Sequence, residues 1–259
     1  MTLKAVIFDV GGTIAETADI KRAAFNQAFA EVGLNWVWGR EAFAQVLANA
    51  LPGAEVEFYA LLRHPETFNR LERNGMLDRI PKRQQQIYFN LLEAGAATLR
   101  PGVARLMAEI VSSGTRLSLC STGPRLEFET LLFNRFGLEM VDAVSVTVSG
   151  EDLQGASPAQ AYRTCLDRLR LHSSEVLVIE NAAQGVAAAA SLGATVIATP
   201  SQYTLDHNFP GAGLVISDLG HPAAPFSVFA GGPIGTGYIT LESLQFIHQS
   251  PFMAEANAA

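Results

Sequence analysis

The sequence predicts an α/β protein with a doubly wound parallel sheet and an all-helical segment inserted after its first strand. From residue 103 onward, short apolar runs alternate with helical patterns, which is typical of a parallel sheet covered by helices. Between the first apolar run and residue 97, the apolar residues follow a helical spacing. We therefore expect a core of residues 1–15 and 97–220, a helical insert of 16–96 and a C-terminal extension of 221–259.

Each element of the core follows from a local pattern. Continuous apolar runs predict buried strands, and apolar positions three or four residues apart predict helices, which here end at a glycine. The predicted strands are 3–8, 116–120, 144–148, 176–179 and 195–198, and the predicted helices are 103–113, 125–136, 158–170 and 184–191. The insert shows four helical faces, containing Phe25, Phe43, Phe58 and Ile87, and the third is expected to stop before Pro65.

Composition narrows the class of protein. The chain has 259 residues, of which 49% are hydrophobic and 17% charged, with a net charge of −7. The negative balance argues against a nucleic-acid partner. No apolar run approaches the roughly 20 residues needed to cross a membrane. The first residues lack the basic and apolar regions of a secretory signal, so a cytoplasmic protein without a membrane partner is expected.

Two minor features predict structure rather than chemistry. Cys120 and Cys165 belong to no metal-binding spacing, and we expect two free thiols in the core. The glycine-rich run 231–237 lacks the lysine of a phosphate loop and is expected to be a turn before a short strand or helix. The chain after Met253 is expected to fray. The apolar residues of the extension are expected to pack on the core: Phe226, Val228, Phe229, Ile239 and Leu244.

Polar residues directly follow three predicted strands. Asp9 follows the first, Ser121 the second, and the pair Glu180 and Asn181 the fourth. The carboxyl ends of parallel strands meet in one crevice, which is where open α/β sheets hold ligands. A purely structural interpretation exists for each, because Asp, Ser and Asn also cap turns and helices.

Three stretches resemble the haloacid dehalogenase-like (HAD) superfamily: AVIFDVGGTIAET at 5–17, LRPGVARLMAEI at 99–110 and IENAAQGVAAAASLGA at 179–194. The resemblance is strongest to the CbbY-type sugar-bisphosphate phosphatases and β-phosphoglucomutase, and it extends from residue 3 to about 220. It implies a Rossmann-like core with an inserted helical cap. It also implies hydrolysis of a small phosphorylated sugar with the help of Mg²⁺.

The resemblance assigns roles to individual residues. Asp9 occupies the position of the nucleophile, which forms an aspartyl phosphate that water then cleaves. Ser121 occupies the position of the hydroxyl that binds the transferring phosphoryl group. Mg²⁺ would be held by Asp9, the backbone carbonyl of Gly11, Glu180 and Asn181. The further candidate ligand-binding residues are Glu16, Lys21, Thr122 and Gly123.

The chain departs from the family pattern at three chemical positions of this centre. Gly11 replaces the aspartate that acts as acid and base, a loss that typically costs around 10² to 10⁴ in rate. Asn181 replaces a charged metal ligand, so Mg²⁺ is expected to be weakly held or absent. The family's lysine is missing from GASPAQAY at 155–162, where Tyr162 remains and the nearest cation, Arg163, is expected to point outward.

The helical insert departs as well. The segment Ala18-Asp19-Ile20-Lys21 lacks the Glu and His that family members tend to place there. The family's Gly-Gly-Lys substrate loop is replaced by Pro52-Gly53-Ala54-Glu55, which exchanges a cation for an anion.

These departures predict a CbbY-like protein whose phosphatase activity is lost or greatly weakened. It would bind a small phosphorylated sugar or a protein partner. The first alternative is an active Mg²⁺-dependent phosphatase in which Glu16, Glu180 or Asp152 replaces the missing carboxylates. The second is dehalogenase-like or phosphonatase-like chemistry, which also lacks the second aspartate but needs a lysine, and Lys21 is the near candidate.

Overall fold

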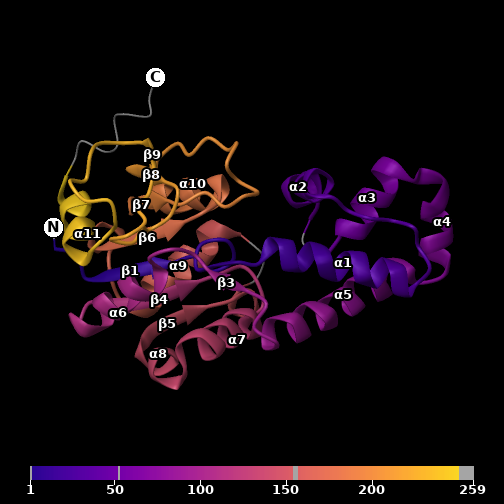
Figure 1. Ribbon diagram of the computed structural model, residues 1–259, viewed down its shortest axis with the longest axis horizontal. Coiled ribbons are helices and arrows are strands. Elements are labelled where there is room, and N and C mark those ends of the chain that lie inside the picture. The colour runs from indigo at the N-terminus through magenta and orange to yellow at the C-terminus, as the bar shows by residue number, and fades with distance from the viewer. Residues whose placement is uncertain (1, 52, 154–156, 251–259) are drawn as a thin grey trace. The chain divides into compact units, whose positions relative to one another are not determined.

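The computed structural model describes residues 2–51, 53–153 and 157–250, whose elements are labelled in Figure 1. The described residues form two compact units. The first, called the core, comprises the residues up to Glu16 and those from Thr98 onward. The second, called the cap, is Thr17–Ala97. The segment after residue 220, which we had expected to be an extension, belongs to the core unit as far as it is described.

The core is built around a sheet whose described strands have the order β5-β4-β1-β6-β7-β8-β9. All neighbours are parallel except β8 and β9, which are antiparallel. The strands are β1 (Ala5–Phe8), β4 (Arg116–Cys120), β5 (Val144–Val148), β6 (Val176–Glu180), β7 (Thr195–Ala198), β8 (Leu214–Ile216) and β9 (Val228–Ala230). The doubly wound α/β fold is confirmed, and β1 lies between β4 and β6.

Helices connect these strands, as their amphipathic patterns predict. They are α6 (Val103–Ser112), α7 (Arg125–Phe136), α8 (Leu138–Ala143), α9 (Pro158–Leu169), α10 (Ala183–Ser191) and α11 (Leu241–Gln249), with short 3₁₀ turns η1 (Gly150–Asp152) and η2 (Ser173–Glu175). Cys120 and Cys165 are free and buried in the core, as predicted. Among the described residues, no helix combines the length and apolar character that crossing a bilayer requires.

The cap is helical, as the sequence predicts. Its helices are α1 (Ala18–Glu31), α2 (Arg40–Asn49), α3 (Glu55–Arg63), α4 (Pro65–Arg73) and α5 (Met76–Glu93). Large aromatic side chains fill its interior, where Trp38 stacks on Phe43 and tilts against Phe25. The third helix stops before Pro65, but this proline then begins a helix that we did not predict. Proline is favoured in the first turn of a helix, where its missing N–H has no partner to lose.

Two strands at the periphery were not predicted, and one prediction there needs correction. The chain enters and leaves the cap through two short antiparallel strands, β2 (Ala15–Glu16) and β3 (Thr98–Leu99), which a two-residue pattern cannot reveal. In the segment after residue 220, Ile239 and Leu244 are buried as expected. The side chains of Val228 and Phe229 are instead exposed, by 47% and 54%, because β9 is the outermost described strand of the sheet.

Candidate active site at the carboxyl edge of the sheet

We call the chemical positions of the family's site stations: Asp9 is the first, Ser121 the second, the GASPAQAY stretch the third, and Glu180 with Asn181 the fourth. The order of the strands brings the first, second and fourth stations to one edge of the sheet. Phe8, the last residue of β1, pairs with Leu119 of β4 on one side and Ile179 of β6 on the other. Asp9 therefore follows the central strand of three, with Ser121 and Glu180 following its neighbours. The backbone N–H of Asp9 donates to the carbonyl of Ile179 at 2.9 Å. This hydrogen bond holds the backbone of Asp9 beside the end of β6.

A tight turn after β1 presents the Asp9 carboxylate. The Thr13 hydroxyl donates to Asp9 Oδ2 at 2.8 Å, and the N–H of Ile14 donates to the carbonyl of Val10 at 2.9 Å. Gly12 has φ of +89°, a left-handed conformation that favours glycine. A Cβ at Gly12 would also overlap the Asn181 side-chain amide, so first and fourth stations pack directly together.

The carboxylate of Glu180 is enclosed by protein. Its side chain is 5% exposed, and it accepts hydrogen bonds from the Tyr162 hydroxyl at 3.1 Å and the Ala182 N–H at 2.6 Å. A Cβ at Gly185 would overlap this carboxylate, which explains the glycine in the first turn of α10. Burial, together with the charge of Asp9, raises the pKa of Glu180 well above its usual range.

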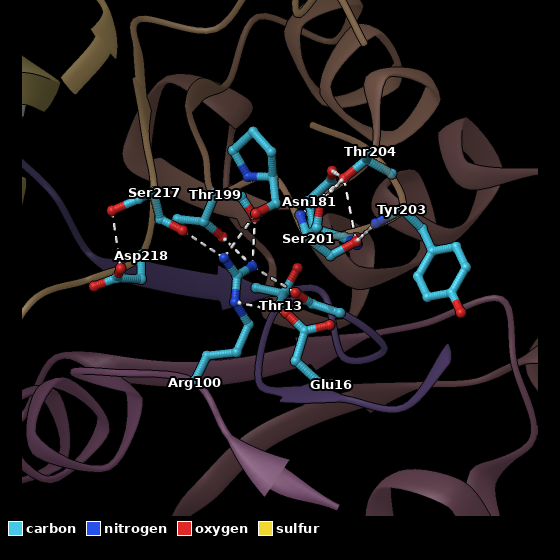
Figure 2. A network of polar contacts seen from close by, with 12 residues as sticks. Thr13, Glu16, Arg100, Asn181, Thr199, Ser201, Tyr203, Thr204, Ser217 and Asp218 are labelled. Carbon is cyan, nitrogen blue, oxygen red and sulfur yellow. Dashed lines mark hydrogen bonds and ion pairs between the residues drawn. The ribbon is translucent and has the colours of Figure 1, made fainter. Parts of the chain in front are cut away.

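Asn181 is held by a loop that the sequence analysis did not single out. The Thr204 hydroxyl donates to the backbone carbonyl of Asn181 at 2.7 Å. The same hydroxyl accepts a hydrogen bond from the N–H of Ser201 at 2.8 Å, as Figure 2 shows. Thr204 is 23 residues away from Asn181, which directly follows β6, so no local pattern predicted this contact.

The donor set at this edge fits Mg²⁺ poorly. Among the described residues, no group of three or more His, Cys, Asp and Glu side chains could hold a metal ion. Of the expected ligands, Glu180 already accepts two hydrogen bonds from the protein. The Asn181 amide packs against Gly12 and carries no charge. Mg²⁺ requires hard, preferably charged oxygen ligands in near-octahedral geometry, and this set supplies few of them.

The second station contains an acid that the sequence analysis missed. The N–H of Gly123 donates to Ser121 Oγ at 3.0 Å. A Cβ at Gly123 would lie 3.2 Å from Ser121 Oγ and also 3.2 Å from Glu127 Oε2. Glu127 is buried in the first turn of α7. Thr122 is exposed on the same loop. The sequence shows a carboxyl residue shortly after Ser121, which could have marked Glu127 as a candidate. Its burial, however, depends on the tertiary fold and could not be predicted.

The GASPAQAY stretch at 155–162 contains no cation in place of the family's lysine. Ser157 precedes Pro158 at the start of α9, and residues 155 and 156 of the GASPAQAY stretch lie outside the described part. Arg163 is exposed on α9, as expected. The position that would clamp phosphate with a lysine therefore carries an uncharged side chain.

Asp152 is the centre of an ion-pair cluster rather than a replacement acid. Its carboxylate accepts from Arg125 and Arg168, each at 2.7 Å, and from the Ser149 hydroxyl at 2.8 Å. The Arg168 contact, with the Ser149 hydrogen bonds, holds the pKa of Asp152 well below its usual range. A carboxylate held in its charged form by two arginines is poorly suited to exchange protons with a substrate near neutral pH.

The remaining candidates have local partners. Glu16 lies in β2 and forms an ion pair with Arg100, with 3.5 Å between its Oε1 and Nε. Within the cap, Lys21 lies with its ammonium 5.2 Å from the centre of the Tyr88 ring. Asp19 pairs with Arg22 and Arg40 at 3.1 and 2.7 Å. Pro52 of the replaced substrate loop lies outside the described residues, and Glu55 begins α3.

Comparisons with known proteins agree with this fold and these motifs. The haloacid dehalogenase-like hydrolase family matches residues 3–193. Protein CbbY of Rhodobacter capsulatus is 33% identical over 220 residues, which cover 85% of this chain and 95% of that protein. The plasmid-borne CbbY of Cupriavidus necator is 32% identical over 224 residues, which cover 86% of this chain and 88% of that protein.

Solved structures give the same picture. CbbY from Rhodobacter sphaeroides, crystallised in complex with phosphate, is 28% identical and superposes with a TM-score of 0.72 over 84% of this chain and 95% of that one. A β-phosphoglucomutase from Clostridium difficile is 15% identical with a TM-score of 0.68, over 95% and 97% of the two chains, and therefore supports the fold alone.

Proposed function

We propose, given that this chain belongs to the haloacid dehalogenase-like hydrolase family, that it binds a small phosphorylated sugar but hydrolyses it very slowly or not at all. The observation that carries the proposal is the joint replacement at three chemical positions of the family's site. Gly11 and Asn181 occupy the positions of the acid/base and the second metal ligand, and Ser157 lies in the GASPAQAY stretch from which the phosphate-binding lysine is missing. A protein partner at the same surface would be the alternative binder if no phosphorylated compound binds.

The three replacements act on different parts of one reaction. Without a carboxylate at Gly11, no side chain at that position can protonate the leaving oxygen, which typically costs around 10² to 10⁴ in rate. Phosphoryl transfer further depends on neutralising the charge of the transferring group. Asn181 and Ser157 each remove part of that neutralisation. Because the effects fall on separate groups, we expect their combination to suppress turnover strongly.

The features that could hold a phosphoryl group without breaking it are retained. The Ser121 hydroxyl remains beside the Asp9 strand, and the turn around Gly12 keeps its hydrogen bonds. The solved Rhodobacter sphaeroides relative was crystallised with phosphate, and a mutant of it with xylulose-(1,5)bisphosphate. These ligands define the compound class with which binding to this chain should first be tested.

The experiment measures phosphate release from a panel of sugar monophosphates and bisphosphates in the presence of Mg²⁺. It compares the wild type, Asp9→Asn and the triple variant Gly11→Asp/Asn181→Asp/Ser157→Lys. We expect no release by the wild type above Asp9→Asn, and a gain of at least about 10² in the triple variant. Adding Asp9→Asn to the triple variant should abolish that gain. Wild-type turnover that is as fast as that of the triple variant and disappears in Asp9→Asn would contradict the proposal.

The second candidate function is a working Mg²⁺-dependent phosphatase that uses Asp9 as nucleophile and a surrogate acid. Its specific support is Glu127, a buried carboxylate facing the same glycine as Ser121. If this function holds, Glu127→Gln should lower wild-type phosphate release by around 10²-fold, while Glu129→Gln on the exposed side of α7 should not. Equal release by both variants would eliminate Glu127 as the surrogate.

A further inference from the structure

Arg100 lies immediately after β3 and makes the densest set of polar contacts around the β1 turn (Figure 2). Its side chain is only 6% exposed. Nη1 donates to the carbonyls of Gly12 at 2.6 Å and Thr199 at 2.5 Å. Nη2 donates to the carbonyls of Pro200 at 2.8 Å and Ser217 at 2.5 Å. One guanidinium therefore joins the loops that follow β1, β7 and β8.

The charge of Arg100 is retained inside the protein. Burial lowers its pKa, while the charges of Glu16 and Asp218 oppose that shift. Arginine stays protonated in proteins, so the cation must be stabilised where it lies. Carbonyl dipoles and the Glu16 carboxylate supply this stabilisation. Removing the guanidinium would leave the accepting carbonyls of Gly12, Thr199, Pro200 and Ser217 without this partner.

Among these carbonyls, that of Gly12 matters most for the candidate site. Gly12 belongs to the turn that presents Asp9, and its backbone packs against the side chains of Asn181 and Ser201. The backbone N–H of Arg100 also donates to the carbonyl of Ile14, the last part of the same turn, at 2.9 Å. Arg100 thus contacts the turn from its side chain and from its backbone.

We propose that Arg100 is a positioning residue: it fixes the Gly11–Gly12 turn, and with it Asp9, against the loops that follow β7 and β8. This role goes beyond the proposed function, because it holds whether the site cleaves its ligand, only binds it or does neither. Arg100 acts through the backbone of the turn.

Arg105 provides a matched control. It too is an arginine that donates to backbone carbonyls, those of Leu219 at 3.4 Å and Gly220 at 3.3 Å, but no described contact joins it to the β1 turn. The test is amide hydrogen exchange, followed by NMR, in ligand-free wild type, Arg100→Met and Arg105→Met. It compares the amides of Gly12, Thr13 and Ile14 with those of β4.

In Arg100→Met, exchange of the turn amides should accelerate at least about tenfold more than exchange of the β4 amides. In Arg105→Met the two sets should change by the same factor. Arg100→Lys should recover part of the protection, because an ammonium can reach some of the carbonyls. If the turn and β4 amides of Arg100→Met change by the same factor, Arg100 is merely a stabilising residue and the proposal is wrong.

If Arg100→Met does not fold, Arg100→Lys and Glu16→Gln replace it in the same comparison. In each variant, exchange of the turn amides should accelerate about two- to fivefold more than exchange of the β4 amides. An equal change in the two sets of amides would again overturn the proposal. Inorganic phosphate binding is measured in parallel by calorimetry. Failure of the wild type to bind phosphate would contradict the proposed function, whereas the amide comparison alone decides the role of Arg100.

Discussion

Two largely buried charges at the carboxyl edge of the sheet are stabilised in opposite ways. Arg100, beside β1, is surrounded mainly by neutral backbone carbonyls from three loops. Asp152, beyond β5, is surrounded by two full cations, Arg125 and Arg168. The first cluster has one side chain at its centre and backbone around it, whereas the second consists mostly of side chains.

This difference shows which parts of the site can change in sequence without loss of the fold. Any residue supplies a carbonyl, so the loops around Arg100 keep their partner while their side chains vary. Gly11 and Asn181 lie in or beside loops held in this way. Side chains at these two positions can therefore change while the backbone arrangement of the edge stays in place.

The largest effect should come from removing the centre of the carbonyl cluster. Arg100→Met should lower the free energy of unfolding by about 3–5 kcal/mol, because buried carbonyls and Glu16 lose their partner. Arg105→Met, whose contacts are longer and partly exposed, should cost about 1 kcal/mol. Urea unfolding measures both. Similar decreases in the free energy of unfolding for the two variants would show that the carbonyl cluster around Arg100 stabilises the fold no more than the contacts of Arg105 do.

A smaller effect should separate packing from backbone strain at the β1 turn. Gly12→Ala combines a left-handed φ with overlap against Asn181 and should cost about 2–4 kcal/mol. Gly114→Ala has a similar φ of +77° but faces open space, and should cost about 1–2 kcal/mol. Thermal unfolding of both variants gives the difference. Equal losses would mean that Asn181 moves freely to accommodate the methyl group.

The smallest effect should come from the ion-pair cluster, and it should depend on pH. Asp152→Asn should cost about 1.5–3 kcal/mol near pH 7, against almost nothing for exposed Asp142→Asn. Because the pKa of Asp152 is lower in the folded state, its contribution is complete above the unfolded pKa of about 3.9. It is lost as the pH falls below that value toward the folded pKa.

The corresponding measurement is the difference in unfolding free energy between wild type and Asp152→Asn at pH 7, 5 and 3. The difference should stay constant between pH 7 and 5 and shrink at pH 3. A difference that grows on acidification would reverse the sign of the linkage and show that Asp152 is stabilised in its protonated form.

Most of the core could be predicted because its patterns are local. The strands ending at Phe8, Cys120 and Glu180 are short apolar runs followed by polar residues, and such runs identify buried parallel strands. The unpredicted elements are short or lie at the periphery. The strand β9 is three residues long and exposed, so neither burial nor periodicity marks it.

The stations themselves could be placed, but the contacts that hold them could not. Arg100 and Gly12 are 88 positions apart, and Thr204 and Asn181 are 23 apart. Neither pair leaves a periodic trace in the sequence. The ion pairs of Asp152 were not visible in the sequence for the same reason, since Arg168 comes from the following helix. Charge type was visible in the sequence, but the pairing of charges depended on the tertiary fold.

The two buried thiols can serve as intrinsic probes of local unfolding in the core. Cys120 directly precedes Ser121 at the end of β4, and Cys165 lies in α9, both shielded from solvent. A thiol-reactive dye can label them only when the surrounding structure opens. The labelling rate of the wild-type chain would therefore report how often the end of β4, just before Ser121, becomes accessible. No cysteine has to be introduced for this measurement.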